Sequence, residues 1–395
     1  MNMSEVAKVF VTDGRSLAAL AIARSLGSKG IEVHCGDDFA TNVTSFSRYV
    51  KHNYVYPQPE AEPERFVDFL LKLVERENYD LILPVRDKTT EIISQYKDRF
   101  LDRTNLLIAD YNIIQKFMDK GETIKLARDA KVSIPNTYFP KEESIEQISH
   151  KVTYPALVRP RRSSGSRGIE YVNSQNDLLK AYHYVRSQYG EPIIQEYISH
   201  EGGHYSVATL FDSNSNPVST HVYVETKQYP ISGGPAVNAV SVEKPAWVDE
   251  YLRFLKDNNW VGPAHMDVLY DINTNRPRLL EVNPRFWMSL NLSIQSGVDF
   301  PYLLYQLSTG EKVRPTQEYQ TGVKYRWMLP NEILWLFQTK NKAQGLLDLL
   351  RFREKGTCHA TYNKEDLKPL FGVFAQGLYF LAHSEKRKFM FKRGW

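Results

Sequence analysis

Short apolar runs alternate with amphipathic segments through the N-terminal part of the chain. The apolar runs predict buried strands at 8–12, 31–36, 79–85 and 105–110. Between them, apolar residues recur every three or four positions, which predicts helices over 16–30, 64–77 and 87–100. Alternation of strands and helices at this spacing indicates a parallel sheet with helices on its faces. We therefore expect an α/β domain over residues 1–112.

The turn after the first apolar run lacks the glycines of a dinucleotide-binding loop. It reads TDGRSLAAL, in which Gly14 is the only glycine, so G-x-G-x-x-G is absent. This favours a parallel sheet that binds no dinucleotide. Arg86 and Asp87 follow the run 79–85, at the edge where open α/β sheets bind ligands. They are candidates for substrate contact, and a solvated pair of loop residues is an equally good interpretation.

The pattern changes from Lys120 onward. A helix is predicted at 120–131, and the part of the chain that follows it contains more predicted strands than helices. Strands are predicted at 154–160, 169–172, 192–198, 204–212, 217–230, 236–242, 263–271 and 277–285. Helices are predicted at 176–190 and 248–259. We divide this part of the chain into a smaller unit over 113–198 and a larger unit over 199–319.

The composition is that of a globular protein in a reducing compartment. With 42% hydrophobic and 24% charged residues, the chain is neither disordered nor fibrous. Cys35 and Cys358 lie far apart in no metal-ligand pattern, so we expect neither a disulfide framework nor a zinc site. The longest apolar stretch, 370–382, is too short to span a bilayer, and no secretory signal is evident. These features predict a cytoplasmic protein without a transmembrane segment.

Positive charge is concentrated at the C-terminal end. The net charge is +4, but residues 320–395 contain 14 basic and 6 acidic side chains, and the last twelve residues contain five basic and one acidic. We expect a basic, mostly helical extension over 320–395. The composition favours a solvated tail, and its tip is also compatible with an anionic membrane surface or an acidic partner. Aromatic residues in the tail permit base stacking, but no RNA-binding signature accompanies them, so we expect no nucleic-acid partner.

A loop rich in serine and glycine lies between the predicted strands 154–160 and 169–172. It reads RRSSGSRG, at 161–168. Its glycines let backbone N–H groups approach an anion, and its hydroxyls can donate to phosphate oxygens. The residues concerned are Ser163, Ser164, Gly165, Ser166 and Gly168. A phosphate-binding loop and a mobile surface turn are both consistent with this sequence.

Two carboxylates and an amide lie in the last two predicted strands. Glu281 and Asn283 are two residues apart and so point to the same face, where Asp267 of the neighbouring strand can meet them. This set of oxygen ligands suits Mg²⁺. A carboxylate paired with a nearby arginine is the alternative, but unpaired charge within apolar strands is costly. Arg285 follows directly, and its planar fork of donors suits an acyl phosphate or a carboxylate oxyanion.

Five ordered blocks of sequence resemble the ATP-grasp superfamily. LLEVNPRFW is similar to its E-x-N-P-R motif, and FMDKGETIKLARDAKVSIPNT to its M-D-K segment. YPALVRPRRSSGSRGI resembles the strand and flexible loop, and IIQEYISHEGGHYSVATLFD the Q-E-(Y/F) segment. FWMSLNLSIQSGVDFPYLLYQLSTG resembles the helix that follows N-P-R. The resemblance covers roughly residues 5–318. It implies an α+β ATP-grasp fold in which a pre-ATP-grasp domain (1–112) precedes the small lobe (113–198) and the large lobe (199–319).

The resemblance also implies roles for individual residues. Lys120 and Arg159 would bind ATP phosphates, and the loop 161–168 would close over them. The backbone of Glu196, Tyr197 and Ile198 would recognise adenine, and His204 stands at the ribose position. Asp267, Glu281 and Asn283 would bind two Mg²⁺ ions, with Mn²⁺ as an alternative, and Arg285 would stabilise the reacting carboxyl phosphate. Lys227, Gly233 and Gly234 resemble a loop over the acceptor site, although Gly233 and Gly234 are equally consistent with a tight β-turn.

Three of these positions depart from the family pattern. Arg159 stands where lysine is usual, and the two side chains differ in geometry. His204 replaces a common glutamate, which puts the ribose contact in doubt. His265 stands where several ligases carry arginine; it is a substrate-site candidate without a catalytic role. All three metal positions and Arg285 match the pattern.

Among ATP-grasp proteins, the chain most resembles carboxylate–amine ligases such as D-aspartate ligase and carbamoyl-phosphate synthetase-like proteins. The implied reaction joins a carboxylate to an amine through an acyl phosphate and releases ADP and phosphate. The substrates would be amino acids or similar molecules, for peptide, cell-wall or polysaccharide modification. A carboxylating enzyme that uses bicarbonate and an ATP-binding protein without catalysis are the alternatives. A homodimer is compatible with the sequence.

Overall fold

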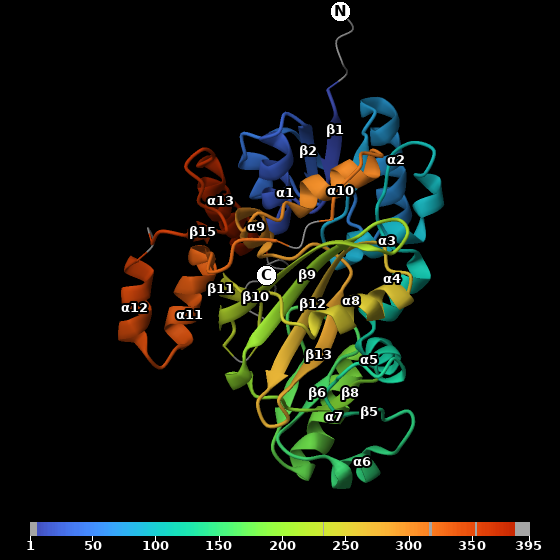
Figure 1. Cartoon of the computed structure of the whole chain (residues 1–395), viewed down its shortest axis with the longest axis vertical. Helices are drawn as coiled ribbons and strands as arrows, with labels where there is room; N and C mark the ends of the chain where they lie inside the picture. Colours follow the sequence, from blue (N-terminus) through green and yellow to red (C-terminus); the bar gives the residue numbers. More distant parts are fainter. Residues whose placement is uncertain (1–5, 232, 316–317, 352–353, 384–395) are drawn as a thin grey trace, which may run out of the picture.

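The computed structural model describes residues 6–231, 233–315, 318–351 and 354–383, and its strands form three sheets (Figure 1). A four-stranded parallel sheet lies at the N-terminal end. A second four-stranded sheet, which is antiparallel, lies at the opposite end of the molecule, and a seven-stranded sheet lies between the two. This arrangement confirms the expected mixed α/β fold with an N-terminal parallel sheet.

Alternating side chains give the N-terminal sheet two apolar faces. Its order is β3 (Val50–Val55), β2 (Glu32–Asp37), β1 (Lys8–Val11), β4 (Leu81–Leu83). In β1, Val9 and Val11 join the core on the side of α1 (Leu17–Gly27). Phe10 points the other way, into the core with α2 (Pro63–Glu77) and α3 (Asp87–Gln95). Successive residues of a strand face opposite sides, so one short run serves both cores.

Two details of this sheet differ from the prediction. Residues 105–110 do not form a strand, since only Asn105 makes a bridge, to Leu81. Leu107, Ile108 and Ala109 are nevertheless buried, so their apolar pattern reflects burial rather than pairing. Conversely, β3 was not expected, because its sequence VKHNYV is polar and half-exposed at the sheet edge.

The small antiparallel sheet has the order β5 (Thr137–Tyr138), β8 (Ile193–Glu196), β6 (Ala156–Arg159), β7 (Glu170–Val172). The helices α6 (Ile145–Lys151) and α7 (Gln175–Tyr189) share an apolar core with this sheet, which contains Ile148, Leu178, Val185 and Ile194. Two further helices, α4 (Tyr111–Met118) and α5 (Lys120–Asp129), lead into it from the N-terminal sheet. The loop 161–168 joins β6 to β7.

The seven-stranded sheet forms the centre of the molecule. Its order is β13 (Arg276–Asn283), β12 (Gly262–Asp271), β9 (His204–Phe211), β10 (Pro217–Gln228), β11 (Ala236–Ser241), β14 (Lys324–Arg326), β15 (Thr357–His359). Val207 and Met266 pack with α8 (Val248–Asp257) on one face. On the other face, Leu210 belongs to the core that also holds α1, α9 (Leu290–Gln295) and α10 (Phe300–Ser308). That shared core docks the N-terminal sheet on the central sheet.

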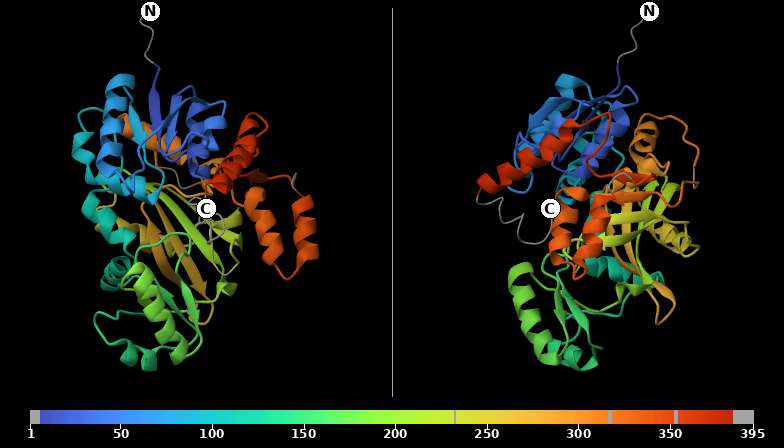
Figure 2. Two further views of the ribbon diagram at one scale, coloured as in Figure 1. Left: turned by 180° about the vertical axis from the view of Figure 1, so that it is seen from behind. Right: turned by 90° about the vertical axis from the view of Figure 1, so that its left-hand side faces the viewer.

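The C-terminal segment is only partly as predicted. It contains the short π-helical turn η4 (Met328–Glu332) and three helices, α11 (Ile333–Gln338), α12 (Lys342–Leu350) and α13 (Lys368–Ala382). It also adds β14 and β15 to the central sheet. These strands were missed because KYR and TCH are too short and too polar to show alternation. Figure 2 shows α11 and α12 projecting from the molecule, and α13 beside the N-terminal sheet. The basic tail at 384–395 lies outside the described residues.

A buried ion pair ties this C-terminal segment to α1. The Arg24 Nε lies 2.9 Å from the Asp366 Oδ2, and both side chains are almost fully buried. The same carboxylate accepts hydrogen bonds from the Ser47 hydroxyl (2.7 Å) and the Arg48 backbone N–H (2.9 Å). Three donors from the N-terminal domain therefore converge on one acidic side chain. Among the described helices, none is long and apolar enough to cross a membrane.

We predict that Asp366→Ala lowers the free energy of unfolding by about 3 kcal/mol, because it leaves the buried Arg24 guanidinium without its counter-ion. Urea denaturation of the full chain measures the change. Glu365→Ala is the matched control, since Glu365 is exposed, and it should change stability by less than about 0.5 kcal/mol. Equal effects of the two substitutions would contradict the role given to Asp366.

Candidate active site

One pocket of about 240 Å³ lies where the three sheets meet. The small sheet contributes the loop after β6 and the end of β8, and the central sheet contributes β9, β10, β12 and β13. Residues at the start of α1 and α3 close it from the N-terminal side. A pocket with walls from three substructures can change shape when those substructures move relative to one another.

A β-bulge directs Glu281 and Asn283 of β13 into this pocket. Asp267 pairs with Glu281, but Val268 pairs with Leu279, so Leu280 is the extra residue. Leu279 and Val282 pack toward α8, while Leu280, Glu281 and Asn283 line the pocket. The Asn283 amide lies 3.1 Å from the Asp267 Oδ2 and 3.5 Å from the Glu281 Oε1. The three predicted metal ligands are thus brought together, and bulges are frequent where a site needs a re-aimed side chain.

Two buried cations meet the Glu281 carboxylate. The Lys120 Nζ and the Arg159 Nη2 each lie 3.2 Å from the Glu281 Oε2. Lys120 also donates to the Ser163 carbonyl (2.6 Å), and Arg159 to the Gln195 Oε1 (2.5 Å). The Arg159 Nε has no hydrogen-bond partner among the described residues. The site therefore holds cationic donors from α5 and β6 at contact distance from a carboxylate of β13.

Arg285 bridges the central sheet and the N-terminal domain. Its Nε lies 2.7 Å from the Asp87 Oδ1, and its Nη1 donates to the Phe286 carbonyl (2.9 Å). Burial alone would lower the pKa of Arg285, but Asp87 more than compensates and raises it. Arg86 also lines the pocket and makes no ion pair among the described residues. Arg86 and Asp87 therefore both line the pocket.

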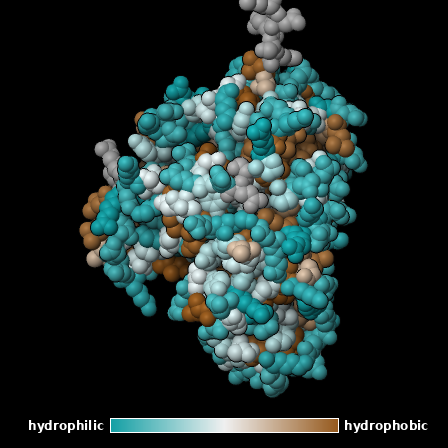
Figure 3. All heavy atoms as spheres, in the orientation of Figure 1, coloured by the Kyte–Doolittle hydropathy of each residue, from teal (hydrophilic) through white to brown (hydrophobic). Residues whose placement is uncertain are grey.

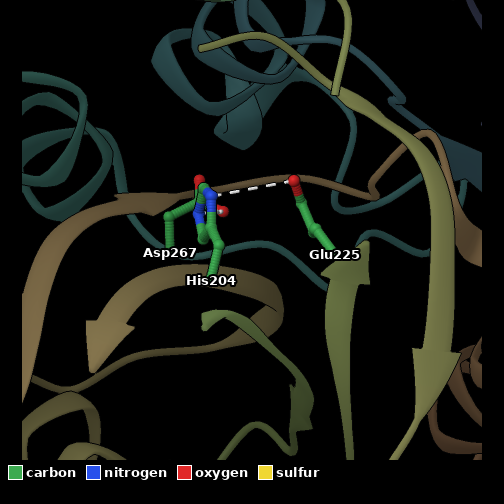
Figure 4. Close-up of side chains that lie close together, drawn as sticks. All are labelled: His204, Glu225 and Asp267. Carbon is green, nitrogen blue, oxygen red and sulfur yellow. Dashed lines mark ion pairs between the residues drawn. The ribbon is translucent and has the colours of Figure 1, made fainter. Parts of the chain in front are cut away.

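His204 lies between two carboxylates (Figure 4). Its Nδ1 is 3.7 Å from the Glu225 Oε2, and its Nε2 is 3.5 Å from the Asp267 Oδ1. Burial opposes protonation, but Glu225 and Asp267 outweigh it and raise the pKa of His204 to about 9. Burial also raises the pKa of Glu225. One ligand atom from each of the three residues lies within 4.8 Å of the others, so they could together hold a cation.

His265 is a buried aromatic contact at the rear of the pocket. Its Nε2 lies 2.9 Å from the Tyr223 hydroxyl, and its ring stacks on Trp287 with centroids 5.6 Å apart. Burial lowers the pKa of His265, which favours the neutral ring. The Asp267 Oδ1 is 3.9 Å away. His265 thus lines the pocket beside Asp267, and its ring packs on Trp287.

Most of the remaining predicted nucleotide residues line the pocket. They are Ser163, Ser164, Gly165, Ser166, Glu196, Tyr197 and Ile198. The Glu196 carboxylate accepts two hydrogen bonds from Asn136, at 2.9 and 2.8 Å. Gly168 does not line the pocket; its φ is +76°, and a Cβ there would meet Tyr189 at 2.6 Å. Gly168 is therefore required by local backbone geometry and packing, which corrects its assignment to phosphate contact.

Lys227 is not part of the pocket, contrary to the prediction. Gly233 and Gly234, which follow it, do line the pocket. The Lys227 Nζ points to the C-terminal helices, 2.9 Å from the Asp348 Oδ2 and 3.5 Å from the Glu332 Oε1. Its ammonium also lies 4.4 Å from the centre of the Trp335 ring. Lys227 thus anchors α11 and α12 behind the pocket loop.

Several pocket residues were not predicted. Glu225 and Gln195 are the clearest cases, because they contact His204 and Arg159. Glu225 could have been identified from the sequence, because it is a carboxylate within the apolar run of β10. The same feature identified Asp267 and Glu281. Ser16 and Met288 had no comparable signal, since only the docking of α1 on the central sheet brings them to the pocket.

We predict that Lys227→Met lowers the free energy of unfolding by about 1–3 kcal/mol, because the buried Glu332 loses a cationic partner. Thermal and urea denaturation measure this loss. Lys244→Met is the control: Lys244 pairs with the exposed Asp249, so its loss should cost less than about 1 kcal/mol. A stability unchanged by Lys227→Met would contradict the anchoring contact.

Comparison with known proteins gives two family matches. A family model described as "ATP-grasp domain" matches residues 117–289. A second, described as "ATP-grasp in the biosynthetic pathway with Ter operon", matches residues 266–330. Together they span the small sheet, the pocket and the junction with the C-terminal segment.

Among curated proteins, acetyl-CoA carboxylase 1 of Arabidopsis thaliana is 26% identical over 157 residues, which is 37% of this chain and 7% of that protein. Pyruvate carboxylase of Bacillus subtilis is 22% identical over 321 residues, 76% of this chain and 27% of that protein. The chain thus spans less than a third of the length of either relative.

Solved structures of similar fold include a biotin carboxylase domain dimer of Hydrogenobacter thermophilus 2-oxoglutarate carboxylase, in complex with MgADP, ADP and bicarbonate. It has a TM-score of 0.66 and 17% identity, and the match covers 80% of this chain and 73% of that one. Biotin carboxylase from Campylobacter jejuni, in complex with an ATP compound, has a TM-score of 0.65 and 16% identity, covering 82% and 75%. Residues 117–289 thus match an ATP-grasp domain, and the chain shares the fold of these biotin carboxylase structures.

Proposed function

We propose that the pocket binds MgATP and that the chain is an ADP-forming ligase, which joins a carboxylate to an amine through an acyl phosphate. The observation that supports this most strongly is the meeting of Lys120 and Arg159 with Glu281, beside Asp267. Cationic donors attract phosphate oxygens, and adjacent carboxylates attract the divalent ion that accompanies them. Each half of the cluster neutralises the other while no nucleotide is bound.

The oxygen ligands fit Mg²⁺. Asp267, Glu281 and Asn283 offer two carboxylates and an amide on one face of neighbouring strands. Hard oxygen ligands of this kind suit Mg²⁺, and Mn²⁺ as an alternative. These three residues would hold the metal, two ions by family resemblance, which supplies positive charge to the phosphates when bound. Glu225 lies at the same end of the pocket, next to His204 and Asp267, and would offer a further carboxylate oxygen.

The rest of the nucleotide would lie along the small sheet. Asn136 holds the Glu196 carboxylate, and the segment 196–198 lines the pocket, where its backbone would bind adenine. Lys120 and Arg159 would bind the phosphates, and Ser163–Ser166 would close over them. Closure of this loop would exclude water, which otherwise hydrolyses an acyl phosphate.

The carboxylate substrate would bind between Arg285 and Arg86. In the first step, a substrate carboxylate oxygen attacks the γ-phosphorus, the bond to the bridging oxygen breaks, and ADP leaves. In the second, the amine attacks the acyl carbon, phosphate leaves, and the amine gives up a proton. Arg285, oriented by Asp87, is placed to stabilise the negative charge of the reacting acyl phosphate. Arg86 has no carboxylate partner among the described residues, and it would bind a second anionic group of the substrate.

Carboxylation with bicarbonate is the second candidate. It is favoured by the relatives, since the curated matches are acetyl-CoA and pyruvate carboxylases and one similar structure contains bicarbonate. Bicarbonate can accept a phosphoryl group as a carboxylate does. Its attack on the γ-phosphorus of ATP would therefore resemble the first step of the ligase reaction. The two proposals differ in the acceptor that follows, and an acceptor panel distinguishes them.

We predict that Glu281→Gln and Asp267→Asn each weaken MgATP binding by about 10–100-fold, the effect of losing a contact to a charged group. ADP formation should fall by about 100-fold or more, because charge stabilisation in the transition state is lost as well. Isothermal titration with MgATP measures binding, and a coupled assay measures ADP.

Glu250→Gln on α8 is the control, since Glu250 is exposed and outside the pocket. It should leave both quantities unchanged. Circular dichroism would verify that the variants remain folded. Wild-type MgATP affinity in a folded Glu281→Gln variant would contradict the metal and phosphate assignment.

A further inference from the structure

The exposed apolar surface of the molecule is concentrated in the C-terminal segment. Ten of the nineteen large apolar side chains that are exposed in the described part of the chain lie between residues 337 and 381. On α13, Phe371 is 70% exposed, Phe374 59%, Leu378 68% and Leu381 43%. Their spacing of three or four residues places them on one side of the helix. Helix α12 exposes Leu346, Leu347 and Leu350 as well, and Figure 3 shows apolar side chains at the edge of the molecule where α11 and α12 project.

The opposite side of α13 is already packed. Gly372, Gln376 and Phe380 are buried, and the Gln376 side chain accepts a hydrogen bond from the Val43 N–H (2.9 Å). A Cβ at Gly372 would lie 2.9 Å from the Phe46 ring and 3.1 Å from the Val43 carbonyl, so the helix rests directly on η1 (Thr44–Phe46). Because this side is fixed to the N-terminal domain, the helix cannot turn its exposed apolar side inward.

Charge surrounds this apolar side without interrupting it. No charged residue occurs between Lys368 and His383. After α13 the sequence continues EKRKFMFKRGW, with five basic residues, one acidic residue and three aromatic ones. An apolar helix side followed by a basic and aromatic segment has the composition of an interfacial membrane anchor. At fifteen residues, α13 is about 22 Å long, short of the roughly 30 Å of a bilayer core.

We propose that α13 lies in the plane of an anionic lipid surface, with Phe371, Phe374, Leu378 and Leu381 among the acyl chains, and that the positive charge of the sequence 386–393 adds attraction to anionic headgroups. Neither the apolar helix side nor the basic sequence suffices alone for membrane attachment, but the two together give stable and reversible binding. The helices α11 and α12 project on the same side of the molecule as α13 (Figures 1 and 2). Among the described residues, none of α11, α12 or α13 lines the pocket.

Charge favours a lipid surface over a second copy of the chain. In a two-fold contact through α13, each helix would meet the same helix of its partner. Lys364 and Lys368 lie at one end of α13, with Glu365 as the exposed carboxylate nearby, and the basic segment follows the other end. Parallel or antiparallel pairing would therefore bring like charges together, whereas anionic headgroups would neutralise both ends.

The test is flotation of the full-length protein with phosphatidylcholine vesicles, with and without phosphatidylglycerol. We expect binding that requires phosphatidylglycerol and weakens at high salt. Changing Lys386, Arg387 and Lys388 together to Gln should weaken it on the order of 100-fold, and Phe374→Gln with Leu378→Gln at least about tenfold. Leu101→Gln is the control, because Leu101 is an exposed apolar residue of the N-terminal domain, and it should bind as the unaltered protein does.

Failure of the unaltered protein to bind phosphatidylglycerol vesicles would overturn the proposal. So would equal binding by Phe374→Gln with Leu378→Gln. Concentration-dependent dimerisation in light scattering that this double variant abolishes would also overturn it, by assigning the apolar side to a second copy. ADP formation is independent of these outcomes, so a failure here leaves the proposed ligase activity standing.

Discussion

The Glu281 carboxylate holds together parts of the chain that are far apart in sequence. It lies on the central sheet, while Lys120 begins α5 and Arg159 ends a strand of the small sheet. Both cations are almost fully buried, and a buried charge is tolerated only when it is paired and hydrogen-bonded. The small sheet and the central sheet are therefore constrained to present these groups to one another across the pocket.

The surrounding structure meets this constraint by local means. The bulge at Leu280 turns Glu281 and Asn283 toward Asp267 while Leu279 and Val282 stay in the core with α8. Asp87 of the N-terminal domain forms an ion pair with Arg285 of the E-x-N-P-R motif and orients its guanidinium. The C-terminal helices hold the loop after β10 from behind through Lys227. Each of the three sheets thus supports one wall of the same pocket.

The sequence predicted the parts of this structure whose residues carry a periodic or chemical pattern. Buried strands such as 204–211 and 262–271 were evident from apolar runs, and the carboxylates within such runs identified Asp267 and Glu281. Edge strands such as β3, β14 and β15 were not, because polar and half-exposed residues carry no alternation. Lys227 was misplaced for a different reason. Its partner Asp348 is 121 residues away in the chain, and only the fold brings the two together.

The claim at the centre of this account is that the charged cluster transfers the γ-phosphoryl group of ATP to a substrate carboxylate, which an amine then captures. Phosphorus NMR of the reaction products, across a panel of amino acids, uronic acids, amines and bicarbonate, tests it most directly. The account predicts ADP and inorganic phosphate in reactions that contain both a carboxylate and an amine, and no turnover when either is omitted. AMP and pyrophosphate as the products, or ADP formation that requires bicarbonate instead of an amine, would contradict it.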